Sequence, residues 1–344
     1  MIAMGAHVDQ TDPIAEARAR GAQLSQFFLG DPQGWKGPKV AYAGGAAALK
    51  SDAEAAGIAL YVHAPYVLNV ASTNNRIRIP SRQHLQKQLV AAAEIGAAGV
   101  IVHGGHLNAD EDPDVGFTNW FKAVDGLDIA VPLLIENTAG GNNAMTRHLE
   151  RIDRLWAAIG ASANASQVGF CLDTCHAHAG GNELLGLVDR IKAITGRVDL
   201  IHANDARDPF DSGADRHANW GTGHCDPDGV ADVLRSANAP VVIETPGGVD
   251  DQRAALQLLE RQAPVQRPQL IGIFGRIARQ QQLPARRQDG PGLPDMHPDL
   301  RRAVRGARII EAGLGRQPVH PLHIVHEQGA GTLGRHAATV EIDA

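Results

Sequence analysis

The chain has 344 residues, of which 44% are hydrophobic, and it contains 38 glycines, 19 prolines and three cysteines. No stretch of about 18 apolar residues occurs, so we expect no membrane span. The N-terminal residues show no secretory signal, and three cysteines do not form a disulfide framework. We therefore expect a cytoplasmic protein with one large α/β domain and an appendage.

The formal net charge of −6 is unevenly distributed. Residues 265–344 contain 11 Arg and 7 Asp/Glu, a net charge of +4, which leaves −10 for residues 1–264. An acidic domain is a poor candidate for nucleic-acid binding, because that affinity depends largely on neutralising phosphates. Several bound divalent ions would reverse the local field, so the overall charge excludes such a partner only weakly.

Eight short apolar runs recur up to residue 244 and predict strands. Runs of this length without alternation indicate strands that are buried on both faces. They are Ile2–Val8, Ala22–Phe28, Ile58–His63, Gly99–His103, Val131–Glu136, Val168–Asp173, Val198–Asn204 and Val241–Glu244.

Helix signals separate these runs. Asp12 and Pro13 predict a helix start and Gly21 its end, since proline suits the first turn and glycine the C-terminal cap. Ser81 is expected to cap a helix that ends near Gly96. Asp250 or Asp251 is expected to begin a last helix.

Strand–helix units repeated eight times in about 260 residues predict an eight-stranded (β/α)8 barrel of the TIM type. The alternative is a doubly wound open sheet, but no glycine-rich phosphate loop follows the first strand. We assign the barrel to residues 1–263. Residues 264–344, rich in Arg, Gln, Gly and Pro, are expected to be an extension of unknown role, partly disordered.

Imidazoles and carboxylates gather where the apolar runs end. In a parallel barrel these ends meet at one face, where the chemistry of such barrels takes place. The nine candidates are His63, His103, Glu136, Asp173, His176, His202, Asp215, His217 and Glu244. One zinc ion takes about four ligands, so nine suit two or three ions, which is an arrangement that cleaves phosphoesters.

A single histidine at a strand end is more often a hydrogen-bonded core or rim residue than a ligand. Repetition at six of the eight predicted strands favours a metal site. Several carboxylates buried together are costly unless cations compensate them. Cys171 and Cys175 are interpreted as small packing residues, Cys175 because adjacent strand residues point to opposite faces.

The chain resembles the endonuclease IV (deoxyribonuclease IV) family of apurinic/apyrimidinic endonucleases over roughly residues 1–262. The motifs that support this are Gly5-Ala6-His7-Val8, His63-Ala64-Pro65-Tyr66-Val67-Leu68-Asn69, Ile135-Glu136-Asn137-Thr138-Ala139-Gly140, Asp173-Thr174-Cys175-His176, His202-Ala203-Asn204-Asp205 and Asp215-Arg216-His217.

The resemblance implies three zinc ions per chain. His63, His103 and Glu136 would hold the first ion. Glu136, which would also be the catalytic residue, would bridge to a second ion completed by Asp173, His202 and Glu244. The third ion would be bound by His176, Asp215 and His217. His106 is then expected to support a ligand rather than to bind metal.

The activity implied by the resemblance is hydrolysis of the phosphodiester 5′ to an abasic site in double-stranded DNA, in base excision repair. The products would be a 3′-hydroxyl and a 5′-deoxyribose phosphate. Tyr66, Val67 and Gln33 would contact the DNA, whereas Trp35 either joins them or packs under its loop. A monomer in the cytoplasm, associated with the nucleoid, is expected.

Two other functions remain open. Glu136, Asp173, His202 and Glu244 would suffice for a sugar isomerase or epimerase with one metal ion; the five further candidates favour the nuclease. The second alternative is a protein that binds damaged DNA without cutting it, against which the complete set of ligands argues.

Overall fold

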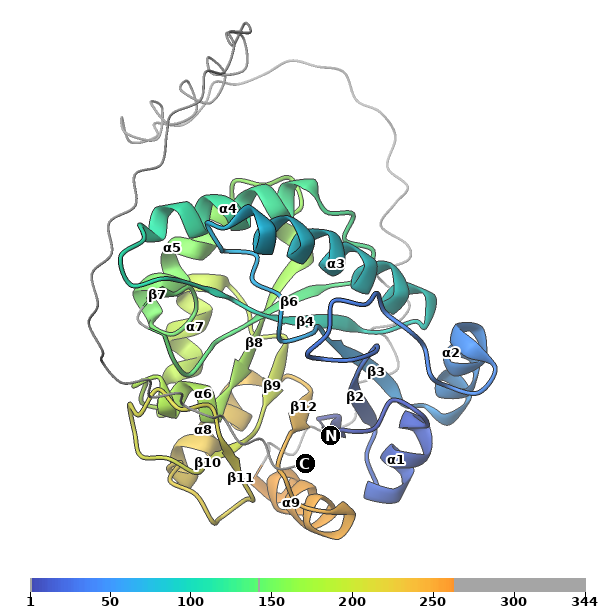
Figure 1. Ribbon diagram of the computed structural model, residues 1–344. Helices are drawn as coiled ribbons and strands as arrows, with labels where there is room; N and C mark the ends of the chain where they lie inside the picture. Colours follow the sequence, from blue (N-terminus) through green and yellow to red (C-terminus); the bar gives the residue numbers. More distant parts are fainter. Residues whose placement is uncertain (1, 142, 263–344) are drawn as a thin grey trace, which may run out of the picture. The chain divides into compact units, whose positions relative to one another are not determined.

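A computed structural model describes residues 2–141 and 143–262. The extension predicted for residues 264–344 lies outside the described residues. In the described part of the chain, parallel strands form a closed barrel in the order β1-β12-β9-β8-β6-β4-β3-β2 (Figure 1). The prediction of an eight-stranded (β/α)8 barrel is therefore confirmed.

Each barrel strand lies within one of the eight predicted apolar runs. Their bounds are β1 (Met4–His7), β2 (Leu24–Phe28), β3 (Ala59–His63), β4 (Gly99–His103), β6 (Leu133–Glu136), β8 (Val168–Asp173), β9 (Leu200–His202) and β12 (Val241–Ile243). Each run becomes a strand because it is buried on both sides, against the barrel interior and against the outer helices.

Helices surround the barrel (Figure 1). Their bounds are α1 (Pro13–Arg20), α2 (Gly45–Ala56), α3 (Asn75–Glu94), α4 (Pro113–Gly126), α5 (Leu149–Ile159), α6 (Thr174–Ala179), α7 (Leu187–Thr195), α8 (Pro227–Ala237) and α9 (Val249–Gln262), with a 3₁₀ turn at Ala165–Gln167. No helix within residues 2–141 and 143–262 is long and apolar enough to cross a membrane.

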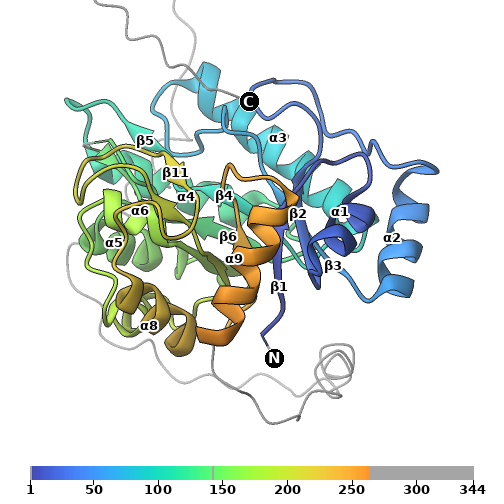
Figure 2. The same ribbon diagram turned by 90° about the horizontal axis from the view of Figure 1, so that it is seen from below.

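Two small antiparallel sheets of two strands each extend from one end of the barrel. They are β5 (His106–Leu107) with β7 (Asn143–Ala144), and β10 (Asp205–Ala206) with β11 (His217–Ala218). Figure 2 shows β5 and β11 on the side of the barrel opposite the N-terminus. Since β1 starts at the N-terminal end, this side is the face where the parallel strands finish.

The predicted helix boundaries agree with the structure for α1 and α9 but not for the start of α3. Asp12 caps α1 through Ala15, and Gly21 closes it in the left-handed conformation. Helix α9 begins at Val249 with both predicted aspartates in its first turn. The prediction that Ser81 caps a helix was wrong. Helix α3 begins earlier, capped by Asn74, and the Ser81 hydroxyl donates to the carbonyl of Ile77 inside it.

Candidate metal centre

The ends of five neighbouring barrel strands bring most of the candidate ligands to one mouth. His63, His103, Glu136, Asp173 and His202 are the last residues of β3, β4, β6, β8 and β9. Pairing between strands aligns His103 with Glu136 and Asp173 with His202. Glu244 follows the last residue of β12. Burial on both faces therefore fixes the register that gathers these side chains.

The remaining three candidates reach the mouth by a cap and a hairpin. Asp173 both ends β8 and caps α6, since its Oδ1 accepts from the backbone N–H of His176 at 2.7 Å. The cap turns His176 back to the mouth. The β10–β11 hairpin pairs Ala206 with His217 and so returns His217, with Asp215 close before it, to the same place.

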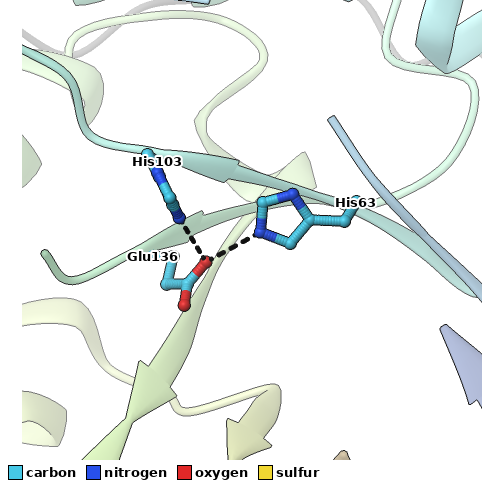
Figure 3. A group of neighbouring side chains, drawn as sticks. All are labelled: His63, His103 and Glu136. Carbon is cyan, nitrogen blue, oxygen red and sulfur yellow. Dashed lines mark hydrogen bonds and ion pairs between the residues drawn. The ribbon is translucent and has the colours of Figure 1, made fainter. Parts of the chain in front are cut away.

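The first group consists of His63, His103 and Glu136 (Figure 3). Both imidazoles point with Nε2 at the same carboxylate oxygen, Glu136 Oε2, at 3.2 Å from His63 and 3.4 Å from His103. The Glu136 side chain is fully buried. One oxygen is thus shared by two imidazole nitrogens.

The second group uses the other oxygen of Glu136. His202 Nδ1 lies 2.9 Å from Glu136 Oε1 and 3.3 Å from Glu244 Oε2. Asp173 Oδ2 lies 3.9 Å from the same nitrogen. Glu136 therefore belongs to both groups, with one oxygen turned to each.

The third group lies on the more exposed side of the mouth. His176 Nε2 is 2.9 Å and His217 Nε2 is 3.5 Å from Asp215 Oδ1. The Asp215 side chain is 53% exposed, whereas that of His176 is 3% exposed. His217 Nε2 is also 3.8 Å from Asp173 Oδ2, which connects this group to the second.

The imidazoles present one ring nitrogen to the mouth because the other is anchored elsewhere. His63 Nδ1 donates to Ala64 O at 2.8 Å, His176 Nδ1 to Asn137 O at 2.9 Å and His217 Nδ1 to Glu244 O at 3.2 Å. A backbone carbonyl that accepts from one nitrogen leaves the other with a lone pair, as metal-binding histidines require.

The spacing of these atoms fits metal coordination. Ligands 2.0–2.1 Å from a zinc ion lie about 3.3 Å from one another at tetrahedral angles, and the closest contacts within the three groups run from 2.9 to 3.5 Å. His176 Nε2 and His217 Nε2 are buried without a well-aligned hydrogen bond. Such atoms are costly unless a ligand satisfies them, so the residues fit a cation in each group.

Opposite charges offset one another in the mouth. Burial favours the neutral form of Glu136, but the imidazoles of His202 and His103 hold its pKa well below the ordinary range. Burial likewise opposes charge on His176, yet Asp173 and Asp215 hold its pKa well above the ordinary value. Burial raises the pKa of Asp173. Protons on imidazoles such as that of His176 would therefore compete with cations for the mouth, and metal binding would displace them.

Two polar residues with no predicted role orient the ligands. Gln26, buried on β2, donates from Nε2 to Glu244 Oε1 at 2.6 Å and accepts from His202 Nε2 at 2.7 Å. Asn204 donates to Asp173 Oδ2 at 2.6 Å and accepts from the backbone N–H of Glu244 at 2.7 Å. The available signal was a glutamine inside an apolar strand, where an amide needs polar partners.

Two side-chain predictions need correction. His106 was expected to support a ligand, but it is exposed on β5, and its hydrogen bonds to Asn69 use its backbone. Cys175 lies on helix α6, not on a strand, so the alternation argument for it was wrong. Its thiol contacts the Arg216 carbonyl, and burial raises its pKa, which favours packing. Burial also raises the pKa of Cys171 to about 12.

The predicted DNA-contacting residues lie at or near the rim. Tyr66 is 53% exposed, and its ring centroid is 5.7 Å from that of His103. Val67 is half-buried against the core, and Gln33 is exposed in the segment after β2. Tyr66 and Val67 line a cavity of about 250 Å³ together with His103 and Thr138. Of these residues, Tyr66 is the one that stands directly against the first group.

Comparisons with known proteins show the family of the chain. Residues 14–262 match the model of the xylose isomerase-like TIM barrel family. The chain is 55% identical over 242 residues to a protein named probable endonuclease 4 from Mycobacterium bovis (strain BCG / Pasteur 1173P2), covering 70% of this chain and 92% of the relative. It is 51% identical over 245 residues to a protein of the same name from Mycobacterium leprae, with the same coverage.

Solved structures with the same fold also match the chain. The crystal structure of endonuclease IV from Thermus thermophilus matches with a TM-score of 0.65 and 26% identity, covering 76% of this chain and 98% of that one. A D-tagatose 3-epimerase-like protein matches with a TM-score of 0.60 and 16% identity, over 76% and 97% of the two chains. At that identity the epimerase shares the fold alone.

Proposed function

The chain belongs to the endonuclease IV family, within the xylose isomerase-like TIM barrels, and we propose that it is a zinc-dependent apurinic/apyrimidinic endonuclease. It hydrolyses the phosphodiester 5′ to abasic sites in double-stranded DNA and leaves a 3′-hydroxyl and a 5′-deoxyribose phosphate. This activity belongs to base excision repair, and we propose that the protein acts as a monomer in the cytoplasm, associated with the nucleoid.

The observation that carries the proposal is the overlap of three ligand groups in one mouth. His63, His103 and Glu136 would hold the first ion, and Glu136 turns its second oxygen to the group of Asp173, His202 and Glu244. His176, Asp215 and His217 would hold the third. Three divalent ions would neutralise the phosphate oxygens and lower the pKa of an attacking water.

Contacts within the protein fix the candidate ligands in position before metal or substrate binds. Glu136 keeps the first two groups at a fixed separation, because one rigid carboxylate serves both. The backbone carbonyls and Gln26 fix the imidazole rings before substrate arrives, so little reorganisation is needed on binding. Tyr66 stands at the rim beside His103, where it can contact a nucleotide that leaves the duplex.

A sugar isomerase or epimerase is the second candidate. Glu136, Asp173, His202 and Glu244 form a complete four-ligand group, which is what a barrel enzyme with one metal ion needs. Such an enzyme has no use for the five other candidate ligands, whose ligand atoms lie close together in two further groups. A protein that binds damaged DNA without cutting it is the third candidate, and a complete set of ligands argues against it.

The deciding experiment combines metal analysis with an incision assay. Purified protein is incubated with a duplex that carries one abasic analogue, with and without a strong chelator, and with an intact duplex as control. About three zinc ions per chain and chelator-sensitive incision 5′ to the analogue support the proposal. One ion per chain and no incision would favour the isomerase. Metal occupancy without incision, but with selective binding, would favour the damage-binding protein.

A further inference from the structure

A groove outside the metal centre has the chemistry of a phosphate-backbone site. Its walls are the segment after β2, with Trp35 and Gly37, and helix α3, with Arg76, His84 and Lys87. It encloses about 340 Å³. The Trp35 indole is 47% exposed, and its ring centroid is 6.4 Å from that of His84. Trp35 is therefore a wall of this groove and is not packed beneath its loop.

One face of α3 lines the groove along its length. Arg76, Pro80, Gln83, His84 and Lys87 follow the helical spacing and line the same cavity. Lys87 lies eleven positions after Arg76 in the helix, which corresponds to about 16 Å. Because the phosphates of one DNA strand recur about every 3.4 Å along the duplex axis, this length exceeds the spacing of two phosphates.

The charge of the groove is positive and uncompensated. Helix α3 carries Arg76, Arg78, Arg82 and Lys87, and Glu94 at its last position is its one acidic residue. Among the described residues, no carboxylate forms an ion pair with Arg76 or Lys87. By contrast, several surface arginines pair with aspartates: Arg147 with Asp211, Arg154 with Asp114, Arg197 with Asp199, Arg216 with Asp208 and Arg253 with Asp250.

His84 contributes shape and not charge. Its side chain is buried, and burial lowers its pKa, so the ring stays neutral near pH 7. The cations of the groove are therefore Arg76 and Lys87, both exposed and placed at opposite ends of the helical face. Two separated cations with an aromatic face between them suit a sugar–phosphate chain, which alternates charge with apolar ring surface.

The segment that carries Trp35 also contacts the rim of the metal centre. The backbone N–H of Tyr66 donates to Pro32 O at 2.8 Å, and Pro32 belongs to the same segment as Trp35. Tyr66 in turn stands against His103 of the first ligand group. In Figure 1 the chain between β2 and α2 lies beside α3. A duplex bound at the mouth could thus continue into the groove.

We propose that the groove between Trp35 and α3 binds the sugar–phosphate backbone of the duplex that flanks the reacting phosphate. Arg76 and Lys87 pair with phosphate oxygens, and the Trp35 indole packs against a deoxyribose. These contacts are independent of base sequence and of the lesion. The inference rests on the proposed function, because it takes duplex DNA as the substrate.

The test is a charge-reversal pair with a matched control. Arg76→Glu and Lys87→Glu are combined in one variant, and Lys122→Glu and Arg235→Glu in another. The control residues are cations on α4 and α8, without an ion pair in the described part of the chain, and the change in net charge is equal. Equal metal content and thermal unfolding temperature show that both variants fold.

The groove variant should bind intact and abasic duplex at least about tenfold more weakly than the control variant. The slope of log K against log salt should become shallower by about 2, because each lost phosphate contact removes about 0.9. Trp35→Ala should weaken binding with little change in this slope. Incision at saturating DNA should stay near that of the wild type.

Equal losses of affinity in the two double variants would contradict DNA binding in the groove. The groove would then be a site for another anionic partner, such as an acidic protein surface. If the groove variant and the wild type had the same slope of log K against log salt, DNA binding in the groove would also be contradicted. The proposed function can fail independently of the groove. If the wild type does not incise abasic duplex but the groove variant alone loses duplex binding, DNA binding in the groove is supported and the endonuclease assignment is contradicted.

Discussion

Replacing Gln26 by leucine tests whether the second ligand group depends on residues behind it. The Gln26 amide donates to Glu244 Oε1 at 2.6 Å, accepts from His202 Nε2 at 2.7 Å and lies 3.0 Å from His7 Nδ1. Leucine has a similar volume but no polar atom, so all three contacts are lost without leaving a large cavity. The His202 ring would then lose the acceptor that keeps Nδ1 turned to the mouth.

The expected loss of metal affinity follows from the role of such supporting contacts. Mutation of the groups that orient metal ligands typically costs 10- to 100-fold in affinity, or about 1.4–2.7 kcal/mol. Hydrogen bonds to charged groups contribute about 1.5–3 kcal/mol each, so the cost should lie toward the upper end. The loss should concern the ion held by Asp173, His202 and Glu244, since Gln26 contacts two of these residues.

The assay is metal content after dialysis against graded chelator concentrations. We expect Gln26→Leu to lose about one of about three ions at a 10- to 100-fold lower chelator strength than the wild type. Gln88→Leu is the matched control, because Gln88 is equally buried but lies on α3 and bonds to His84. Identical release curves for Gln26→Leu and the wild type would refute the reasoning.

Three further substitutions test individual roles. Glu136→Gln should abolish incision and leave the thermal unfolding temperature near that of the wild type, because a neutral amide is a poor bridge between two cations; near-normal cleavage at equal metal content would exclude the bridging role. His217→Ala should lower the metal content from about three ions to about two, as measured by elemental analysis, and an unchanged content would remove His217 from the ligands. Tyr66→Ala should reduce the preference for abasic over intact duplex more than the affinity for intact duplex; equal losses on both would limit Tyr66 to packing or backbone contact.

Much of the fold and part of the metal centre could be predicted because the strands of a parallel barrel share one sequence pattern. An apolar run predicts a strand, and the polar residue that ends it predicts the mouth. His63, His103 and Glu136 follow this rule, and the structure places both imidazoles within 3.4 Å of Glu136 Oε2. Strand register places His103 opposite Glu136 and His63 opposite Ile101, two residues before His103, so the strand ends alone bring these three residues to the same mouth.

Other features depend on local contacts that the pattern does not contain. The turn of His176 back to the mouth comes from the cap formed by Asp173, and it was misread as continued strand. The start of α3 was misplaced because Pro80 and Ser81 resemble a helix beginning, whereas Asn74 provides the cap. Asp205 accepts backbone hydrogen bonds from Gly221, Gly223 and Cys225, which fixes the chain after His217, and no periodicity in the sequence indicates this.

The three ligand groups are coupled by the residues that they share. Glu136 turns one oxygen to His103 and the other to His202, and Asp173 lies 3.8 Å from His217 of the third group. Removing one cation would leave a buried carboxylate partly uncompensated, which is costly in a site of low polarity. The neighbouring groups would then have to offset that charge. The occupancy of each group would therefore depend on the others, and we expect the mouth to bind cations as one cluster.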